Sequence, residues 1–329
     1  MPNSQVFVTR QIPQPGLDLL AASTELEVWP GELPPPYEIL LEKAQGRAGL
    51  LCMLTDRIDR DLLASASGQL KVVSQMAVGF DNIDVQAATE LGIPVGNTPG
   101  VLTEATADFA WALLMAAARR VVEADRLTRA GGWKTWGPQT LLGPELTGAT
   151  LGIVGFGRIG QAVARRASGF NMRILYFDHN PNPEAGQALG AEWAPFERLL
   201  AESDFVSIHT SLSAGTVHLF GAIQFKLMKP SAILVNTARG AVIDQPALFE
   251  ALCSKTIAYA AIDVAEKEPI PLDDPLLTLD NLVIAPHIAS AGIQTRIKMS
   301  VMAAENLLAG LRGERLPYCA NPQVYLPGC

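Results

Sequence analysis

One stretch of the chain, TLGIVGFGRIG at residues 150–160, restricts the possible folds more than any other. An apolar run typical of a buried strand leads into a glycine-rich turn, and residues with helical periodicity follow. Gly155, Gly157 and Gly160 have the G-x-G-x-x-G spacing, which permits a tight turn, a close approach to a pyrophosphate and close helix–strand packing. The positive end of the helix dipole would then face the phosphates. This context predicts a dinucleotide-binding βαβ unit.

The acid after the next predicted strand bears on which dinucleotide is bound. The apolar segment 174–177 is followed by Asp178, whose carboxylate can accept hydrogen bonds from both ribose hydroxyls. The same carboxylate would repel a 2′-phosphate, so the sequence favours NAD and leaves NADP as the alternative. Arg158 lies inside this glycine motif, and we expect its side chain near the phosphates.

Strand and helix patterns alternate along most of the chain. In the first hundred residues, QVFVTR, LEVW, GLLCML and LKVVSQMAV are typical of strands, with helical patterns between them. A second alternation starts near Thr150 and continues through MRILYFD, DFVSIHT, AILVNT, YAAIDV and NLVIAP, and a long helix is expected at roughly 293–311. Such alternation predicts an α/β fold with doubly wound parallel sheets covered on both faces.

Composition excludes several classes of protein. A chain of 329 residues with 49% hydrophobic and 18% charged residues suits two globular domains, and a net charge of −8 argues against nucleic-acid binding. Four cysteines without a C-x-x-C pair indicate a reducing compartment. The most apolar helical run, 109–118, is about half the length of a membrane span, and no secretory leader is apparent. We therefore expect a cytoplasmic protein with no membrane, nucleic-acid or metal partner.

Hydride transfer to a carbonyl needs a proton donor, and histidine suits this role near neutral pH. Of the four histidines, His179 follows the ribose-binding acid, and His218 lies in a predicted surface helix. His209 and His287 each follow a predicted strand, where ligands bind in open α/β sheets. His209 better suits a structural or cofactor-lining role, so His287 is the predicted acid.

Two charged residues follow the strands that precede His287. Arg239, after AILVNTA, can hold a carboxylate with two parallel hydrogen bonds. Glu268 can hold the His287 ring and fix its tautomer, although a solvated loop charge is an equal alternative from spacing alone. Gly240 suggests room for a substrate beside Arg239.

Four motifs in one order, GIVGFGRIG, VNTARGAVID, IDVAEKEP and PHIAS, resemble the D-isomer-specific 2-hydroxyacid dehydrogenase family. The resemblance runs from about residue 5 to about residue 316. Within the family, MAVGFDNID, NTPGVLTEATAD, GGWKTW and LLAGLRGE are similar to the glyoxylate/hydroxypyruvate reductases, also called glycerate dehydrogenases. The resemblance implies NAD(P)H-dependent reduction of small 2-oxo acids, glyoxylate or hydroxypyruvate, to D-2-hydroxy acids.

The resemblance also implies an organisation of the chain. It predicts two Rossmann-like domains, one flavodoxin-like and one dinucleotide-binding. Residues 1–99 and 287–329 would form a discontinuous substrate-binding (catalytic) domain, and residues 100–286 an NAD(P)-binding Rossmann domain. A homodimer is implied, formed through the nucleotide domain and an arm near residues 120–147.

Site residues follow from the same resemblance. The implied catalytic residues are Arg239, Glu268 and His287. The implied substrate contacts are the backbone of Val78 and Gly79, the side chains of Arg239 and Ser290, and Trp136 of a neighbouring subunit, for which interface packing is the alternative. The implied cofactor contacts are Thr103, Gly155, Gly157, Arg158, Ile159, Gly160, Asp178, Thr210, Thr237, Ala238, Arg239, Asp263 and His287.

Two alternative functions stay open. One is a dehydrogenase of another D-2-hydroxy acid, such as lactate or a branched acid. The other is a non-catalytic dinucleotide sensor like the C-terminal-binding-protein corepressors, which share the fold and the catalytic trio. Three other relatives are disfavoured: formate dehydrogenase by Glu268, phosphite dehydrogenase by Val78, and phosphoglycerate dehydrogenase by the absence of basic residues in MAVGFDN.

Overall fold

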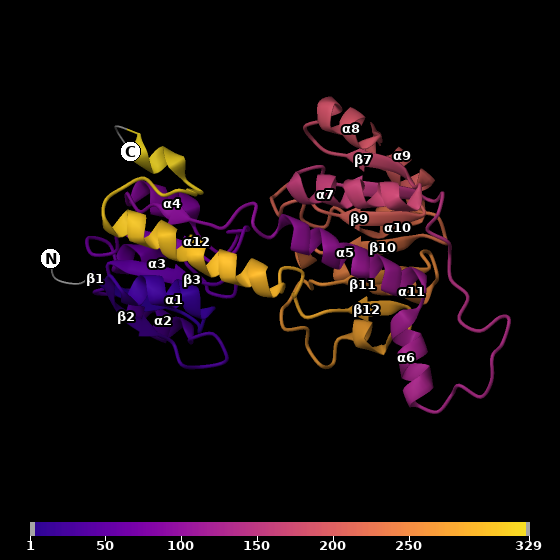
Figure 1. The fold of residues 1–329 in the computed structure, drawn as a ribbon, viewed down its shortest axis with the longest axis horizontal. Coiled ribbons are helices and arrows are strands. Elements are labelled where there is room, and N and C mark those ends of the chain that lie inside the picture. The colour runs from indigo at the N-terminus through magenta and orange to yellow at the C-terminus, as the bar shows by residue number, and fades with distance from the viewer. Residues whose placement is uncertain (1–3, 327–329) are drawn as a thin grey trace. The chain divides into compact units, whose positions relative to one another are not determined.

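The computed structural model describes residues 4–326, and the chain forms two compact units (Figure 1). Unit 1 comprises Met1–Leu102 and Ala291–Cys329, and unit 2 comprises Thr103–Ser290. The predicted domain boundaries lie a few residues before these limits, so that His287 belongs to unit 2.

Unit 1 is built on a parallel sheet. In its described residues, five strands have the order β2-β1-β3-β4-β5, with Val6 of β1 opposite Leu26 of β2 and Gly49 of β3. This is the doubly wound arrangement that the strand–helix alternation predicts. The elements are β1 (Ser4–Val8), α1 (Gln14–Ala21), β2 (Thr24–Val28), α2 (Tyr37–Ala44), β3 (Gly49–Cys52), α3 (Arg60–Ser65), β4 (Val72–Gln75), α4 (Val85–Glu90), β5 (Val95–Gly96), α12 (Ile293–Leu311) and η4 (Pro322–Tyr325).

The last long helix returns to unit 1 and covers one face of its sheet. α12 packs against α1, β3 and β4 (Figure 1). A Cβ added at Gly310 would lie 2.5 Å from Cβ of Val72, so only glycine lets the helix approach this closely. On the other face, Phe7, Leu50 and Val73 form a core with residues of α2, α3 and α4.

The segment after α12 closes an edge of the same sheet. Cys319 forms an antiparallel bridge with Gly96 of β5, and the Ala320 N–H donates to the Val95 carbonyl at 2.7 Å. The buried side chain of Asn321 accepts from the Val95 N–H at 2.8 Å. Sequence patterns predict no role for this tail, and the structure shows that it pairs with a strand edge that would otherwise be open.

Unit 2 is built on a larger parallel sheet. Its described residues contain seven strands in the order β12-β11-β10-β9-β6-β7-β8. The α/β fold with two parallel sheets is confirmed. The elements are α5 (Thr103–Ala118), α6 (Val121–Arg129), β6 (Thr150–Val154), α7 (Arg158–Ala167), η1 (Ser168–Phe170), β7 (Arg173–Phe177), α8 (Pro183–Leu189), β8 (Ala191–Trp193), α9 (Phe196–Glu202), β9 (Phe205–Ile208), α10 (Ala222–Leu227), β10 (Ile233–Asn236), η2 (Gly240–Val242), α11 (Gln245–Cys253), β11 (Tyr259–Ile262), η3 (Pro275–Thr278) and β12 (Leu282–Ile284).

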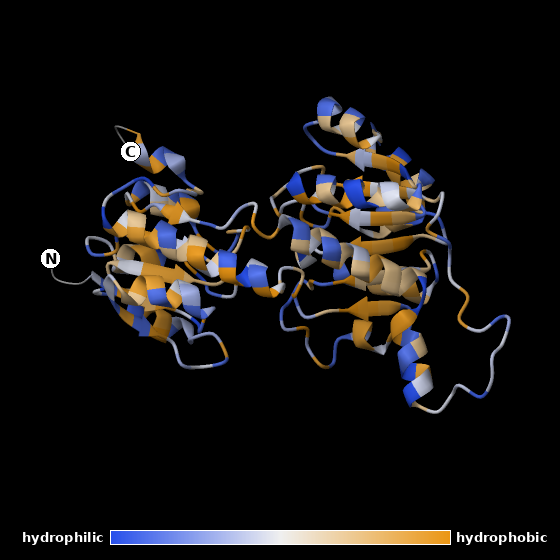
Figure 2. Cartoon of the chain, viewed as in Figure 1, coloured by the Kyte–Doolittle hydropathy of each residue, from blue (hydrophilic) through white to orange (hydrophobic). Residues whose placement is uncertain are grey.

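Apolar residues dominate the strands of this sheet, as the colouring of Figure 2 shows, and they are buried on both faces. Alternate residues of one strand enter different cores: Ile233 and Val235 of β10 pack in the core that includes α5 and α7, and Leu234 packs in the core that includes α9, α10 and α11. This double burial explains why the strands are continuous apolar runs in the sequence. None of the helices within residues 4–326 combines the length and the apolar character needed to cross a membrane.

Candidate active site

The residues singled out in the second half of the sequence gather at the carboxyl ends of the unit 2 strands. The chain order reverses between β6 and β9, which are neighbours in the sheet, and crevices at such switch points bind ligands in open α/β folds. Asp178 follows β7 on one side of the switch point. Arg239, Asp263 and His287 follow β10, β11 and β12 on the other side.

The glycines of the 155–160 turn meet the requirements of a dinucleotide cradle. Gly155 has φ +93°, and a Cβ there would lie 2.6 Å from the backbone of His209. A Cβ at Gly160 would lie 2.1 Å from the Gly155 carbonyl oxygen. Gly157, which caps the ten-residue α7, has nothing within 4 Å of its added Cβ, so its backbone is open to approach. The turn thus leaves space for a phosphate group at a helix N-terminus.

Asp178 has a structural contact as well as its predicted role. One carboxylate oxygen accepts from the Phe156 N–H at 2.8 Å, and the other accepts from the Asn180 N–H at 3.0 Å. Each oxygen can accept a second hydrogen bond, so the carboxylate keeps acceptor capacity for ribose hydroxyls. Asp178 therefore ties the end of β7 to the glycine turn.

Four other expected cofactor contacts are polar residues of unit 2. Thr237 is buried, and its hydroxyl oxygen has no hydrogen-bond partner among the described residues. Thr210 follows β9, and Thr103 begins α5. Arg158 is exposed at the first position of α7. The open glycine turn and the orphan Thr237 hydroxyl fit a bound dinucleotide, because each offers a polar contact that the protein itself does not fill.

The imidazole of His287 contacts a carboxylate. Its Nδ1 lies 2.7 Å from Oε2 of Glu268, and both side chains keep roughly a quarter to a third of their surface accessible. The other oxygen of Glu268 accepts from the Ala265 N–H at 3.1 Å, which fixes the carboxylate. With Nδ1 donating to Glu268, Nε2 is the ring atom that remains for a substrate.

Asp263 holds the turn that carries His287. Its two carboxylate oxygens accept from the N–H groups of Ile288 and Ala289 at 2.8 and 2.7 Å, and its carbonyl accepts from the His287 N–H at 2.8 Å. Burial raises the pKa of Asp263, against the effect of these two N–H donors. His287 has φ +56°, which is uncommon for a residue with a side chain, and the contacts of Asp263 stabilise that backbone conformation.

Arg239 lies on a turn that its neighbours define. Nη1 of Arg239 donates to the Ala238 carbonyl at 2.8 Å. The buried Asn236 side chain accepts from the Ala238 N–H and donates to the Arg239 carbonyl, both at 2.9 Å. Sequence reasoning missed this role of Asn236, although an asparagine at the end of a strand is a recognised turn signal. The expected room beside Gly240 is wrong: a Cβ there would lie 1.9 Å from the main chain of Ala265.

The other histidines are less suited to proton donation. His209 keeps some accessible surface, but the protein around it desolvates the ring and lowers its pKa to about 3, so it is neutral near pH 7. Its Nε2 lies 2.8 Å from the Ser207 hydroxyl. His218 belongs to a turn with φ +51°, not to the predicted helix, and its Nε2 lies 2.7 Å from Glu266. His179 is exposed after β7.

The structure does not gather every expected site residue in one unit. Val78 and Gly79 belong to unit 1, between β4 and α4. Ser290 is the last residue of unit 2. Trp136 lies in an irregular segment after α6 and is 79% exposed in the single chain. Their roles stay predictions.

A family model and a full-length relative indicate the same family. Residues 111–289 match the family model described as the NAD binding domain of D-isomer specific 2-hydroxyacid dehydrogenases. A glyoxylate reductase of Korarchaeum cryptofilum is 54% identical over 321 residues, which cover 97% of this chain and 96% of that protein.

Solved structures share the fold over nearly the whole chain. A Thermus thermophilus protein superposes with a TM-score of 0.90 at 48% identity, covering 96% of this chain and 99% of its own. An NADPH-dependent glyoxylate/hydroxypyruvate reductase of Sinorhizobium meliloti, solved with NADP and malonate, gives a TM-score of 0.87 at 29% identity and 98% coverage of each chain.

Proposed function

This chain belongs to the D-isomer specific 2-hydroxyacid dehydrogenases, and we propose that it reduces glyoxylate and hydroxypyruvate to glycolate and D-glycerate. As a member of this family it is an NAD(P)-dependent oxidoreductase. The observation that carries the proposal is the 2.7 Å contact between His287 and Glu268. It lies at the carboxyl ends of the unit 2 strands, as does the glycine turn. The names of full-length relatives support these two substrates.

The proposed chemistry assigns one proton-transfer role. When bound, the reduced nicotinamide supplies the hydride that C2 of the 2-oxo acid accepts. Nε2 of His287 donates a proton to the carbonyl oxygen, which becomes the hydroxyl of the product. Glu268 stabilises the imidazolium and holds the ring through Nδ1, 2.7 Å from its carboxylate. General acid catalysis of this kind contributes about 10²–10⁴-fold to the rate.

The substrate carboxylate needs its own partners. Arg239 offers a planar guanidinium that can bind a carboxylate with two parallel hydrogen bonds. Asn236 supports this role because its amide fixes the turn on which Arg239 lies. The backbone N–H groups at Val78 and Gly79 keep their expected part in carboxylate binding, and Ser290 keeps its expected place among the substrate contacts.

NAD is the proposed preferred cofactor. Asp178 follows β7, where a carboxylate favours ribose hydroxyls and disfavours a 2′-phosphate. The Sinorhizobium meliloti neighbour uses NADPH, so the preference has to be measured for this chain. Turnover that is tenfold better with NADPH than with NADH would overturn the preference.

A homodimer in the cytoplasm completes the proposal. In the single chain, α6 buries none of its residues. Apolar side chains of α6 and of the segment that follows it are exposed: Val121, Leu127, Trp133, Trp136 and Leu142. Contact with a second copy would remove this apolar surface from water, and it would give Trp136 its expected position near a neighbouring subunit. The three cysteines in the described range form no disulfide, as in a reducing compartment.

One panel assay tests the function. Glyoxylate, hydroxypyruvate, pyruvate and a branched 2-oxo acid are each offered with NADH and with NADPH, and loss of the reduced nicotinamide absorbance is followed. We expect the highest kcat/KM for glyoxylate or hydroxypyruvate. A clear preference for pyruvate or the branched acid would favour the hypothesis of a dehydrogenase for another D-2-hydroxy acid. No turnover of any acid would favour the hypothesis of a non-catalytic dinucleotide sensor.

A further inference from the structure

The segment that follows β4 in unit 1 has unusual main-chain bonding. Residues 78–80 are half-buried between β4 and α4. Most peptide N–H groups in folded proteins find a partner. Among the described residues of unit 1, however, no acceptor pairs with the N–H groups of Val78, Gly79 and Phe80. Three successive donors are therefore available for an external acceptor.

The carbonyl groups of the same segment are all held. The Ala77 carbonyl accepts from the Thr98 N–H at 2.9 Å. The Val78 carbonyl accepts from the side-chain amide of Asn97 at 2.8 Å. The Gly79 carbonyl accepts from the side-chain amide of Gln75, also at 2.8 Å.

Peptide geometry turns these three contacts into an orientation. In a planar trans peptide, the carbonyl of one residue and the N–H of the next point in opposite directions. Fixing the carbonyls of residues 77–79 therefore fixes the N–H groups of residues 78–80, and each points away from its anchoring donor. Successive backbone N–H groups in a turn conformation can form an anion-binding concavity, and the chain bends at residues 76–78.

The two anchoring amides are themselves buried and braced. Gln75 is fully buried, and its side chain exchanges hydrogen bonds with Asn82. Asn97 is 9% exposed, and its carbonyl accepts from the side chain of Asn306 in α12 at 2.9 Å. Asn306 is fully buried and also accepts from the Tyr318 N–H at 3.0 Å. Both anchors are thus pre-organised by the fold and need no ligand to order them.

We infer that Gln75 and Asn97 are positioning residues that aim the N–H groups of Val78, Gly79 and Phe80 at the carboxylate of the 2-oxo acid substrate. The inference rests on the proposed function and adds the residues that set this anion receptor. The segment 76–82 carries Asp81 and no Lys or Arg, so it contributes only peptide dipoles to carboxylate binding, and the basic partner is the proposed Arg239. Such a receptor suits a small carboxylate better than a phosphorylated acid.

The test compares two asparagine-to-alanine variants in the full-length protein. Asn97→Ala removes the anchor of the Val78 carbonyl. Asn281→Ala is the matched control, because Asn281 also donates its side-chain amide to backbone carbonyls, those of Leu252 and Ala258, away from this segment. KM for glyoxylate, the inhibition constant of oxamate, KM for NADH and Tm are measured for each variant.

We expect Asn97→Ala to raise KM for glyoxylate and the oxamate inhibition constant about five- to tenfold, with KM for NADH changed less than about twofold. Asn281→Ala should lower Tm and leave all three constants near the parent values. If Asn97→Ala does not fold, Gln75→Met reports on the second anchor with the same readouts. Unchanged glyoxylate and oxamate constants in an active variant overturn the inference and leave the proposed function standing. A parent protein that reduces no 2-oxo acid overturns both.

Discussion

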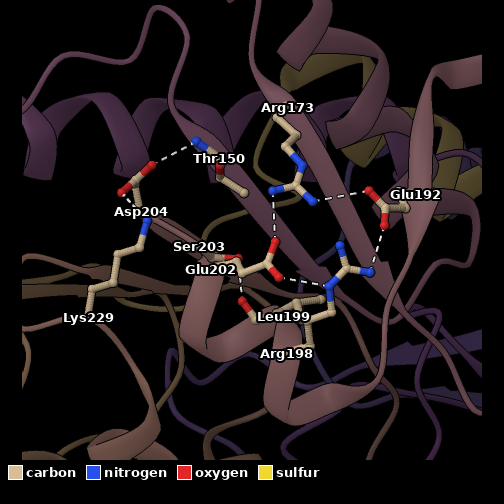
Figure 3. A network of polar contacts seen from close by, with 9 residues as sticks. All are labelled: Thr150, Arg173, Glu192, Arg198, Leu199, Glu202, Ser203, Asp204 and Lys229. Carbon is tan, nitrogen blue, oxygen red and sulfur yellow. Dashed lines mark hydrogen bonds and ion pairs between the residues drawn. The ribbon is translucent and has the colours of Figure 1, made fainter.

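The two ends of the unit 2 sheet carry polar residues in contrasting states. At the amino ends of the strands, charged side chains neutralise one another. Arg173 and Arg198 each contact both Glu192 and Glu202 at 2.7–3.1 Å (Figure 3). Hydrogen bonds from Arg198 and, with a smaller effect, from Arg173 lower the pKa of the Glu202 carboxyl.

The same end has a second closed group. Asp204, just before β9, contacts Lys229 at 2.7 Å and accepts from the Thr150 N–H at 2.8 Å (Figure 3). At the carboxyl ends, by contrast, the buried Thr237 hydroxyl has no partner in the described chain, and Gly157 leaves its backbone open. At the amino ends of the strands the charged side chains pair with one another. At the carboxyl ends, polar groups remain that a ligand could contact.

This contrast indicates which substitutions should reduce activity. Charges that pair with one another at the surface contribute little to stability and nothing to chemistry. Groups oriented for a ligand contribute little to the isolated fold and much to the reaction. We therefore expect substitutions at the carboxyl ends of the strands to reduce activity most and those at the amino ends to reduce it least.

The largest effect is expected at His287. His287→Ala removes the proposed proton donor and should lower kcat by about 10²–10⁴-fold. NADH binding, measured by fluorescence titration, should stay within about twofold, since the ring is proposed to act on the substrate carbonyl. A variant with near-normal kcat would remove His287 from the mechanism.

The second largest loss of activity is expected at Glu268. Glu268→Gln keeps the size of the side chain but removes the charge that faces Nδ1 of His287 at 2.7 Å. We expect kcat to fall about 10- to 100-fold, with a changed pH profile of kcat, because the imidazolium loses its partner. If kcat and its pH profile match the parent, Glu268 is only a solvated loop charge.

Arg239 should affect substrate binding more than turnover. Arg239→Lys keeps the charge but loses the planar fork, so KM for glyoxylate should rise by about tenfold or more. KM for NADH serves as the internal control. Equal glyoxylate affinity in the two proteins would contradict the proposed carboxylate contact.

His209 gives a prediction about stability and pH. Its pKa is about 3 in the folded chain, below the usual value of about 6.5 in an unfolded one. Between these values the unfolded chain binds a proton that the folded chain does not. The contribution of His209 to the free energy of unfolding is therefore fully present above about pH 6.5. It is lost as the pH falls from there to about 3, and the unfolding constant rises by up to about tenfold per pH unit.

His209→Gln should remove that part of the acid sensitivity. Chemical denaturation of parent and variant between pH 7 and pH 4 measures the two slopes. A parallel decline in both proteins would show that the desolvation of His209 does not govern acid stability.

The smallest effect is expected at the amino ends of the strands. Arg198→Ala breaks two exposed ion pairs of the four-residue group and should lower Tm by about 2 °C or less. Because these charges lie at the amino ends of the strands, opposite the carboxyl ends where the active site is proposed, kcat and KM should be unchanged. A large loss of activity in Arg198→Ala would contradict the contrast between the amino and the carboxyl ends of the unit 2 strands.

Much of this layout could be predicted from the sequence. Doubly buried strands such as β6 and β10 are continuous apolar runs, and Arg239 and His287 directly follow such runs. β8, with the sequence AEW, and the two-residue β5 escape prediction because short or partly exposed strands lack that signal.

Contacts between distant residues could not be predicted. The approach of Ala265 to Gly240 and the hold of Asp263 on Ile288 and Ala289 depend on loop paths, and no local pattern encodes those paths. The same is true of Asn97 and Asn306, which are far apart in the sequence and bonded in the fold.

The return of α12 and the 318–321 tail to unit 1 has a consequence for synthesis on the ribosome. The first hundred residues emerge long before the segment that covers their sheet and pairs with β5. Until that segment is translated, the nascent chain presents an apolar face and an unpaired strand edge, both of which favour aggregation. Unit 2 is contiguous and can fold as soon as it is made, whereas unit 1 must wait until α12 and residues 318–321 have been translated.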